Sequence, residues 1–331
     1  MKKLLTAIAL MIAAFLPVAA RAEEPESVRV AIGGRALITY LPFTLAEQLG
    51  YFKDSGIVVS ISDFQGGSQS VEALVGGSAD MAIGAYEHTL VLQAKGIALE
   101  TVALLNDSYG AVIALKPALA KTYKAPADLK GLKFGVTAPG SSSALALELL
   151  LAKGDLPITA VSVIGIGAGP GAVAAGKAGQ LDGVSQFDPV ITPLVRDGDV
   201  VPIVDTRTAD GMKYLYGGPI AGSSVLTTVA FAASHRAAVQ GFVTSIVRAL
   251  KWFATASAED VAKAVPATYY GADRALYMQE IDLNRASFSH DGVVPRDAAA
   301  NTLKVLTTYG PLKGKSVAID KSYDNSFVSV H

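Results

Sequence analysis

The chain has 331 residues, of which 51% are hydrophobic and 17% charged, a composition that excludes a disordered chain and leaves room for two domains with separate cores. It contains no cysteine, which excludes both a disulfide framework and a lipid-modified amino-terminal cysteine. The formal net charge is −1 and no basic run is suited to a phosphate backbone, so we expect no nucleic-acid partner.

The first 22 residues have the pattern of a secretory signal peptide. Lys2 and Lys3 precede an apolar run over residues 4–18, and small residues lead to a cleavage point after Ala22. The run contains Pro17 and falls short of the roughly 20 residues that span a bilayer, which makes an uncleaved membrane anchor the weaker interpretation. We therefore expect a soluble mature protein in a bacterial periplasm.

Two stretches of the chain repeat one order of predicted elements: a strand, a helix, a second strand, a second helix, a Gly-x-x-Asp segment and a third strand. The first copy has strands at 28–33, 57–64 and 81–84, and helices near 42–50 and 68–75. The second copy has strands at 133–137, 160–166 and 183–186, and helices near 142–153 and 170–178. The Gly-x-x-Asp segments at 77–80 and 179–182 occupy matching places, where glycine can end a helix in the left-handed conformation.

Strands that alternate with helices at this spacing predict an α/β fold of two lobes, each an open, mostly parallel sheet with helices on both faces. Strand-like runs at 101–105 and 111–115 flank a first crossing between the lobes, and runs at 200–204 and 224–229 flank a second. We therefore expect lobe I to comprise residues 23–108 and 218–331, and lobe II to comprise residues 109–217.

The carboxyl-terminal part is predicted to be helical. Ser234 can cap a helix that extends to about residue 256, in which apolar side chains between residues 239 and 253 recur at helical spacing and predict one buried stripe. Pro295 suits the first position of another helix, which would end near residue 308. We expect both helices to pack on lobe I.

In open α/β sheets, ligands bind beyond the carboxyl ends of the strands, where helices begin with free N–H groups. Applied to both lobes, this rule predicts the following ligand-binding residues: Tyr40, Gly67, Ser68, Ala85, Tyr86, Glu87, Ser141, Ser142, Ser143, Phe187 and Asp188. We interpret Gly67-Ser68 in one copy and Ser141 to Ser143 in the other as two anion cradles, although Ser68 and Ser142 could instead serve only as helix caps.

The remaining predicted site residues have more than one interpretation. Tyr40 and Tyr86 could form flat walls of a pocket. A carboxylate that faces an anion is repulsive, so Glu87 and Asp188 either point elsewhere or meet a positive or hydrogen-bond-donating group on the ligand. Arg35 could pair with an acidic ligand or lie in a solvated loop.

Enzymatic activity is the second interpretation of these loops. Residues 140–144 resemble a nucleophile elbow, although Ala144 replaces its final glycine and no motif links a histidine to Ser142. No His or Cys cluster has metal-ligand spacing and no phosphate-binding loop occurs. We therefore expect no catalytic residue, metal or cofactor, with a periplasmic serine hydrolase that uses Ser142 as the alternative.

Several motifs together resemble the periplasmic substrate-binding proteins of the nitrate, sulfonate and taurine class of ABC importers. They are Leu-Ala-Glu-Gln-Leu-Gly-Tyr-Phe at 45–52, Gly-Gly-Ser at 66–68, Ala-Leu-Val-Gly-Gly-Ser-Ala-Asp at 73–80, Asp-Leu-Lys-Gly-Leu-Lys at 128–133 and the tail at 320–328. The resemblance implies a type II periplasmic binding protein fold, a small organic anion or zwitterion as the solute, and an ABC permease of the inner membrane as the partner. It points to the same loops as the strand-end rule.

Two receptor alternatives stay open. The same superfamily includes binders of thiamine-precursor pyrimidines and a related pyrimidine-synthesising enzyme, but the cysteine-rich motif of that branch cannot occur in a chain without cysteine. The receptor could also serve a sensor or chemoreceptor in place of a permease. We expect a monomer in either case.

Overall fold

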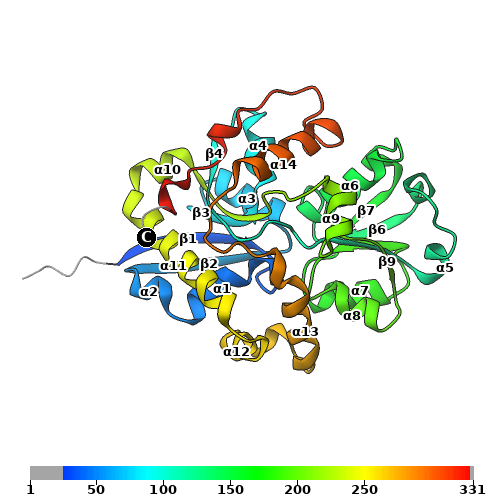
Figure 1. The fold of residues 1–331 in the computed structure, drawn as a ribbon, viewed down its shortest axis with the longest axis horizontal. Helices are drawn as coiled ribbons and strands as arrows, with labels where there is room; N and C mark the ends of the chain where they lie inside the picture. The colour runs from blue at the N-terminus through cyan, green and yellow to red at the C-terminus, as the bar shows by residue number, and fades with distance from the viewer. Residues whose placement is uncertain (1–24, 329–331) are drawn as a thin grey trace, which may run out of the picture.

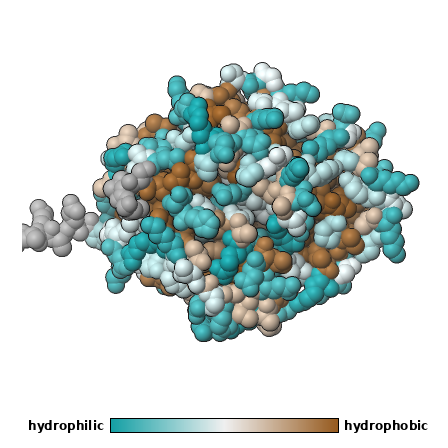
Figure 2. Space-filling view, in the orientation of Figure 1, coloured by the Kyte–Doolittle hydropathy of each residue, from teal (hydrophilic) through white to brown (hydrophobic). Residues whose placement is uncertain are grey.

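The computed structural model of the chain describes residues 25–328 as two sheets surrounded by helices (Figure 1). The predicted signal peptide, residues 1–22, lies outside the described residues. Within residues 25–328, no helix combines the length and apolar character that a membrane crossing requires. On the face shown in Figure 2, polar side chains surround separate hydrophobic patches.

The sheet of lobe I has five strands in the order β2-β1-β3-β10-β4. They are β1 (Glu26–Gly33), β2 (Ile57–Phe64), β3 (Met81–Ala85), β4 (Leu99–Leu104) and β10 (Ser223–Thr228). β1 is parallel to β2 and β3, whereas β10 is antiparallel to both of its neighbours. The last strand of the chain therefore lies inside the first sheet.

The sheet of lobe II repeats this pattern in the order β7-β6-β8-β5-β9. Its strands are β5 (Val112–Leu115), β6 (Lys133–Val136), β7 (Ser162–Gly165), β8 (Gly183–Gln186) and β9 (Val201–Asp205). Here β5 is the strand that runs antiparallel to both neighbours. The predicted α/β fold of two mostly parallel sheets is confirmed.

Helices cover both sheets (Figure 1). Those around the first sheet are α1 (Leu41–Gln48), α2 (Tyr51–Asp54), α3 (Gly67–Val75), α4 (Glu87–Gln93), α10 (Val229–Ser234), α11 (Arg236–Thr255), α12 (Ala258–Ala264), α13 (Arg274–Asn284) and α14 (Arg296–Thr308). Those of the second lobe are α5 (Pro117–Ala120), α6 (Ser142–Ala152), α7 (Pro170–Lys177), α8 (Ile191–Arg196) and α9 (Ala209–Tyr216).

The repeat predicted from the sequence extends to individual hydrogen bonds. Gly77 and Gly179 both adopt the left-handed conformation, with φ of 75° and 81°. Asp80 Oδ2 accepts a hydrogen bond from the backbone N–H of Arg29 at 2.9 Å, and Asp182 Oδ2 accepts one from Lys133 at 2.8 Å. Each Gly-x-x-Asp segment therefore ties the end of a helix to the first strand of its own repeat, β1 or β6.

Two predictions about the carboxyl-terminal helices need correction. Ser234 ends α10 and its hydroxyl bonds back to Ala230 O, so His235 and not Ser234 precedes α11. Pro295 precedes α14, which begins at Arg296. The predicted apolar stripe of α11 is buried, including Val239, Phe242, Val243, Ile246, Val247, Leu250 and Phe253.

Two adjacent segments, residues 105–111 and 206–222, connect the sheets. They bond to each other through Thr206 N to Ala111 O at 2.9 Å and Gly222 N to Asn106 O at 3.0 Å. The Asn106 amide also joins lobe I, because it donates to Thr39 O and accepts from Ser223 N. The predicted lobe boundaries at 108/109 and 217/218 fall within these connections and stay a prediction.

Candidate functional site

The two lobes meet where helices begin at the carboxyl ends of strands. The first residues of α3 follow β2 of lobe I, and Ser141 precedes α6 after β6 of lobe II. The backbone N–H of Ser68 donates to Ser141 Oγ at 3.0 Å, and the Ser68 hydroxyl donates to Pro139 O at 3.0 Å. The start of α3 therefore binds the opposite lobe directly.

A cavity of about 730 Å³ lies beside this contact and is lined by both lobes. Its polar lining includes Ser68, Glu87, His88 and Ser141. Its apolar wall includes Val71, Val91, Leu92, Ala144, Leu145 and Val163. A ligand in this space would touch α3 and α4 of lobe I together with α6 of lobe II.

Glu87, the first residue of α4, is only 3% exposed. One carboxylate oxygen, Oε2, accepts a hydrogen bond from the Tyr109 hydroxyl, whereas Oε1 has no partner among the described residues. Burial raises the pKa of Glu87 to about 7, against the opposing effect of the Tyr109 hydrogen bond. Burial and the nearby Glu87 charge also raise the pKa of Tyr40, Tyr109 and Tyr216.

His88 is buried next to Glu87 in the chain, and its Nε2 has no partner among residues 25–328. Burial, with a smaller effect of the Lys95 charge, lowers the pKa of His88 to about 4, so its ring is neutral at neutral pH. A β-carbon added at Gly67 would lie 3.5 Å from Tyr40 Oη and 3.7 Å from His88 Nε2. Both side chains therefore reach the start of α3.

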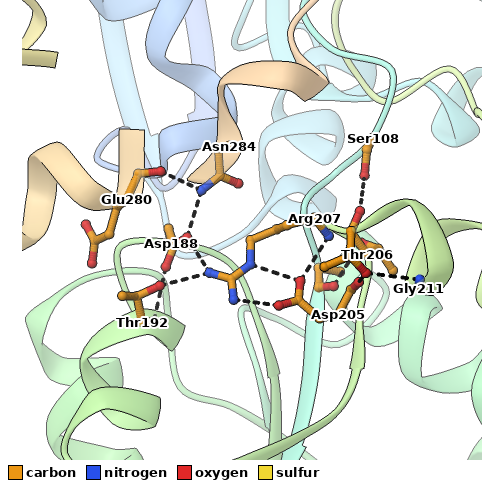
Figure 3. Close-up of polar contacts among 11 residues, drawn as sticks. Ser108, Asp188, Thr192, Asp205, Thr206, Arg207, Gly211, Glu280 and Asn284 are labelled. Carbon is orange, nitrogen blue, oxygen red and sulfur yellow. Dashed lines mark hydrogen bonds and ion pairs between the residues drawn. The ribbon is translucent and has the colours of Figure 1, made fainter. Parts of the chain in front are cut away.

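Asp188, another predicted site residue, makes polar contacts with residues of both lobes (Figure 3). Its carboxylate accepts hydrogen bonds from Arg207 Nη1 at 2.8 Å and from Asn284 Nδ2 of lobe I at 2.7 Å, while its carbonyl accepts from Ile38 N at 3.0 Å. Thr192 N donates to the other carboxylate oxygen, Oδ1, at 3.1 Å, so Asp188 joins the lobes with both carboxylate oxygens hydrogen-bonded. Nearby Glu280 is 2% exposed, and burial, followed by the Asp188 charge, raises the pKa of Glu280 to about 9.

Arg207 and Asn284 did not emerge from the sequence as site residues. Arg207 follows the carboxyl end of β9, so the strand-end rule could have found it; the side chain also pairs with Asp205 at 2.7 Å. Asn284 ends α13 and carried no comparable signal. Arg35, which the sequence suggested for an acidic ligand, pairs with Glu47 within lobe I.

The other predicted site residues lie in several different parts of the structure. The Tyr86 hydroxyl pairs with Ser322 Oγ at 2.6 Å inside lobe I, and Tyr86 is not part of the cavity lining. Ala85 pairs with Ser223 in the sheet, and Phe187 is buried in the core. The Ser143 hydroxyl accepts from Thr137 N at 3.0 Å, which holds the loop before α6.

The two serine-bearing segments occupy different places in the repeated order of elements. α3 follows the second strand of its repeat, whereas α6 follows the first strand of the other. Gly66 precedes α3 and has no side chain, Ser141 precedes α6 and makes no side-chain capping bond, and the hydroxyl of Ser68 reaches lobe II. The serines meet because the lobes face each other.

The hydrolase alternative gains no support from this geometry. Ser142 is 6% exposed and begins α6. Within residues 25–328, no hydrogen bond joins the Ser142 hydroxyl to a histidine ring. The described side chains therefore supply no base in contact with this serine.

The arrangement is similar to that of several solved structures. A protein from Bordetella bronchiseptica RB50 is 43% identical, with a TM-score of 0.88 over 92% of this chain and 96% of that chain. The alkanesulfonate-binding protein SsuA from Xanthomonas axonopodis pv. citri, bound to MOPS, is 21% identical, with a TM-score of 0.72 over 92% of this chain and 100% of its own. The periplasmic nitrate-binding protein NrtA from Synechocystis PCC 6803 is 15% identical, with a TM-score of 0.67 over 91% and 86%.

A shorter similarity connects the chain to an enzyme. The 4-amino-5-hydroxymethyl-2-methylpyrimidine phosphate synthase THI11 of Saccharomyces cerevisiae is 33% identical over 98 residues, which are 29% of this chain and 28% of that protein. The family match is far longer and covers residues 23–266. The resemblance and the two-lobed fold inferred from the sequence are thereby confirmed, and the chain belongs to the NMT1-like family.

Proposed function

We propose that the protein is an extracytoplasmic solute-binding protein of an ABC importer, whose two lobes close over a small organic solute and present it to a permease of the inner membrane. The observation that carries this proposal is the cavity lined by both lobes beside the contact between Ser68 and Ser141. A solute that touches both lobes stabilises the closed form by its differential affinity for that form.

The proposed contacts of the solute are the residues that line the cavity or reach the start of α3: Tyr40, Gly67, Ser68, Glu87, His88 and Ser141. Of the two solute classes expected from the sequence, an organic anion or a zwitterion, the buried carboxylate of Glu87 favours the zwitterion. The names of the similar structures, which mention alkanesulfonate and nitrate, support a small solute that carries a polar head group.

Export to the periplasm and action as a monomer complete the proposal. The signal pattern of residues 1–22 supports export, as do the periplasmic binding proteins among the similar structures. A receptor for a thiamine-precursor pyrimidine is the second candidate, which the partial match to the yeast synthase favours.

A thermal-shift screen tests the receptor role with sulfonates, carboxylates, nitrate, amines and pyrimidines as probes. A probe at about 100 times its dissociation constant should add about 2.7 kcal/mol to the free energy of unfolding. The same probe should reduce the radius of gyration measured by X-ray scattering, because binding closes the lobes.

Matched serine variants locate the binding site. A probe that stabilises the protein in the screen is called a hit. Ser141→Ala should weaken binding of a hit by roughly three- to tenfold in calorimetric titration, because it removes a hydrogen-bonding group at the cavity. Ser162→Ala, which changes an exposed serine of β7, should leave affinity unchanged. A hit that binds both variants equally and causes no compaction would contradict the proposal.

A further inference from the structure

The charges around the 730 Å³ cavity are unequal. Among the described residues that line it, Glu72, Glu87 and Glu148 carry carboxylates, while Lys95 is the one basic residue apart from neutral His88. Lys95 and Glu72 are exposed, whereas Glu87 lies at the buried end. The buried part of the described lining therefore contains a carboxyl group and no cationic side chain.

Oε1 of Glu87 is buried and has no hydrogen-bond partner among the described residues. The titratable groups that interact with this side chain are the hydroxyls of Tyr40, Tyr109 and Tyr216, and none of them is cationic. A carboxylate at the start of α4 is favoured by the helix dipole, but this interaction leaves Oε1 without a hydrogen bond. A buried charge without a partner is unfavourable, and a cation that donates hydrogen bonds would relieve this cost.

Two further acceptors lie within reach of the same region. Tyr40 Oη and the unpartnered His88 Nε2 both approach the start of α3. A neutral imidazole nitrogen and a phenolic oxygen can each accept a hydrogen bond from a bound N–H group. Away from these groups, the walls formed by α3, α4 and α6 are apolar through Val71, Val91 and Leu145.

We infer that the solute carries a positively charged nitrogen group, which pairs with Glu87, and an apolar body, which lies between α3, α4 and α6. This inference rests on the proposed receptor function and specifies its solute class. It makes Glu87 the residue that selects a cationic head group over an anionic or neutral one. The raised pKa of Glu87 agrees with a carboxylate that lacks a counterion in the solute-free protein.

Three probes that share one apolar body test the inference: hexylamine, hexanol and hexanesulfonate. Calorimetric titration at about pH 8, where Glu87 is largely ionised and the amine is protonated, should show that hexylamine binds at least about tenfold more tightly than the other two. Glu87→Gln should remove at least about tenfold of the hexylamine affinity, because the ion pair is lost while Tyr109 keeps an acceptor.

Two other variants make the test specific. Glu100→Gln removes a half-buried carboxylate of β4 outside the cavity lining and should leave hexylamine affinity unchanged. Gly67→Ala should weaken hexylamine binding without unfolding lobe I, because the added methyl group fits in ordinary contact with Tyr40 and His88 and occupies the space between them.

The outcomes separate this inference from the receptor role. If hexanesulfonate binds most tightly and compacts the protein, the inference is overturned and the receptor proposal stands. Equal hexylamine affinity in Glu87→Gln and the unaltered chain also overturns the inference, as does an absence of binding by all three probes at millimolar concentration. The receptor role itself is then decided by the broader thermal-shift screen.

Discussion

Two buried carboxylates near the lobe interface, Glu87 and Asp188, differ in how their oxygens are hydrogen-bonded. Asp188 is satisfied by Arg207 and Asn284, and thereby connects lobe II to lobe I. Glu87 Oε2 accepts a hydrogen bond from the Tyr109 hydroxyl, whereas Oε1 has no partner among the described residues. The first carboxylate connects the lobes, and the second is the one that we propose as the partner of the solute.

The pH dependence of stability should report on Glu87. Its pKa rises from 4.5 in its ordinary state to about 7 in the folded protein, so the folded state binds the proton more tightly. The resulting contribution to stability is present below about pH 4.5 and is lost as pH rises through about 7. As pH rises through this window, the unaltered protein should lose up to roughly 3 kcal/mol of its free energy of unfolding relative to Glu87→Gln. The variant has no titrating group at this position.

Urea unfolding of both proteins between pH 5 and pH 8 measures this difference. The comparison between variants is needed because His88 has the opposite effect: its lowered pKa, about 4, favours folding at higher pH. That contribution is common to both proteins and cancels. Parallel stability curves for the two proteins would show that Glu87 does not titrate in this window.

At the scale of elements, the start of α3 depends on close contact with the end of β1. Gly33 ends β1, and a β-carbon there would lie 2.3 Å from both Gly66 C and Gly67 N. Because these are backbone atoms, the helix start itself would have to move. The strand end thus positions the N–H of Ser68 that binds Ser141.

Gly33→Ala should therefore lower the free energy of unfolding by roughly 1–3 kcal/mol, because overpacking displaces the start of α3. Denaturant unfolding checks the loss, and titration with a hit from the screen should show weaker binding. The control is Gly171→Ala in α7, where no atom outside the adjoining residues and the local helix backbone lies within 4 Å of the added carbon. Equal stability of Gly33→Ala and the unaltered protein would contradict the packing argument.

At the scale of the whole molecule, the lobes contact each other at positions that lack side chains. A β-carbon at Gly66 would lie 2.7 Å from Ser141 Oγ and 2.8 Å from Ala138 Cβ, both in lobe II. The backbone of Gly66 is extended, with φ of −162°, so alanine can adopt its conformation. The conflict therefore arises between lobes and not within lobe I.

Gly66→Ala should consequently impair closure and leave the fold of each lobe intact. We expect a hit from the screen to bind roughly tenfold or more weakly, with little change in the melting temperature of the solute-free protein. X-ray scattering should show less compaction on addition of the same hit, and Gly171→Ala again serves as the control. Full compaction of Gly66→Ala at unchanged affinity would rule out the contact as part of closure.

The sequence by itself determined the local elements and the duplicated order of the fold. The predicted bounds of β2 and β8 match the structure, and the glycines at 77 and 179 end their helices as predicted, because periodicity and backbone freedom are local properties. The strand-end rule also reached Ser68, Glu87 and Ser141, which line the cavity. Such positions follow from element order, which the chain encodes directly.

Only the tertiary structure decided which of the candidate residues share a site. The insertion of β10 between β3 and β4, the meeting of Ser68 with Ser141 and the pairing of Tyr86 with Ser322 join residues far apart in the chain. The partners of Asp188, and the missing partner of Glu87, likewise depend on how the lobes face each other. Contacts of this kind arise from packing between distant segments, which no local pattern of residues specifies.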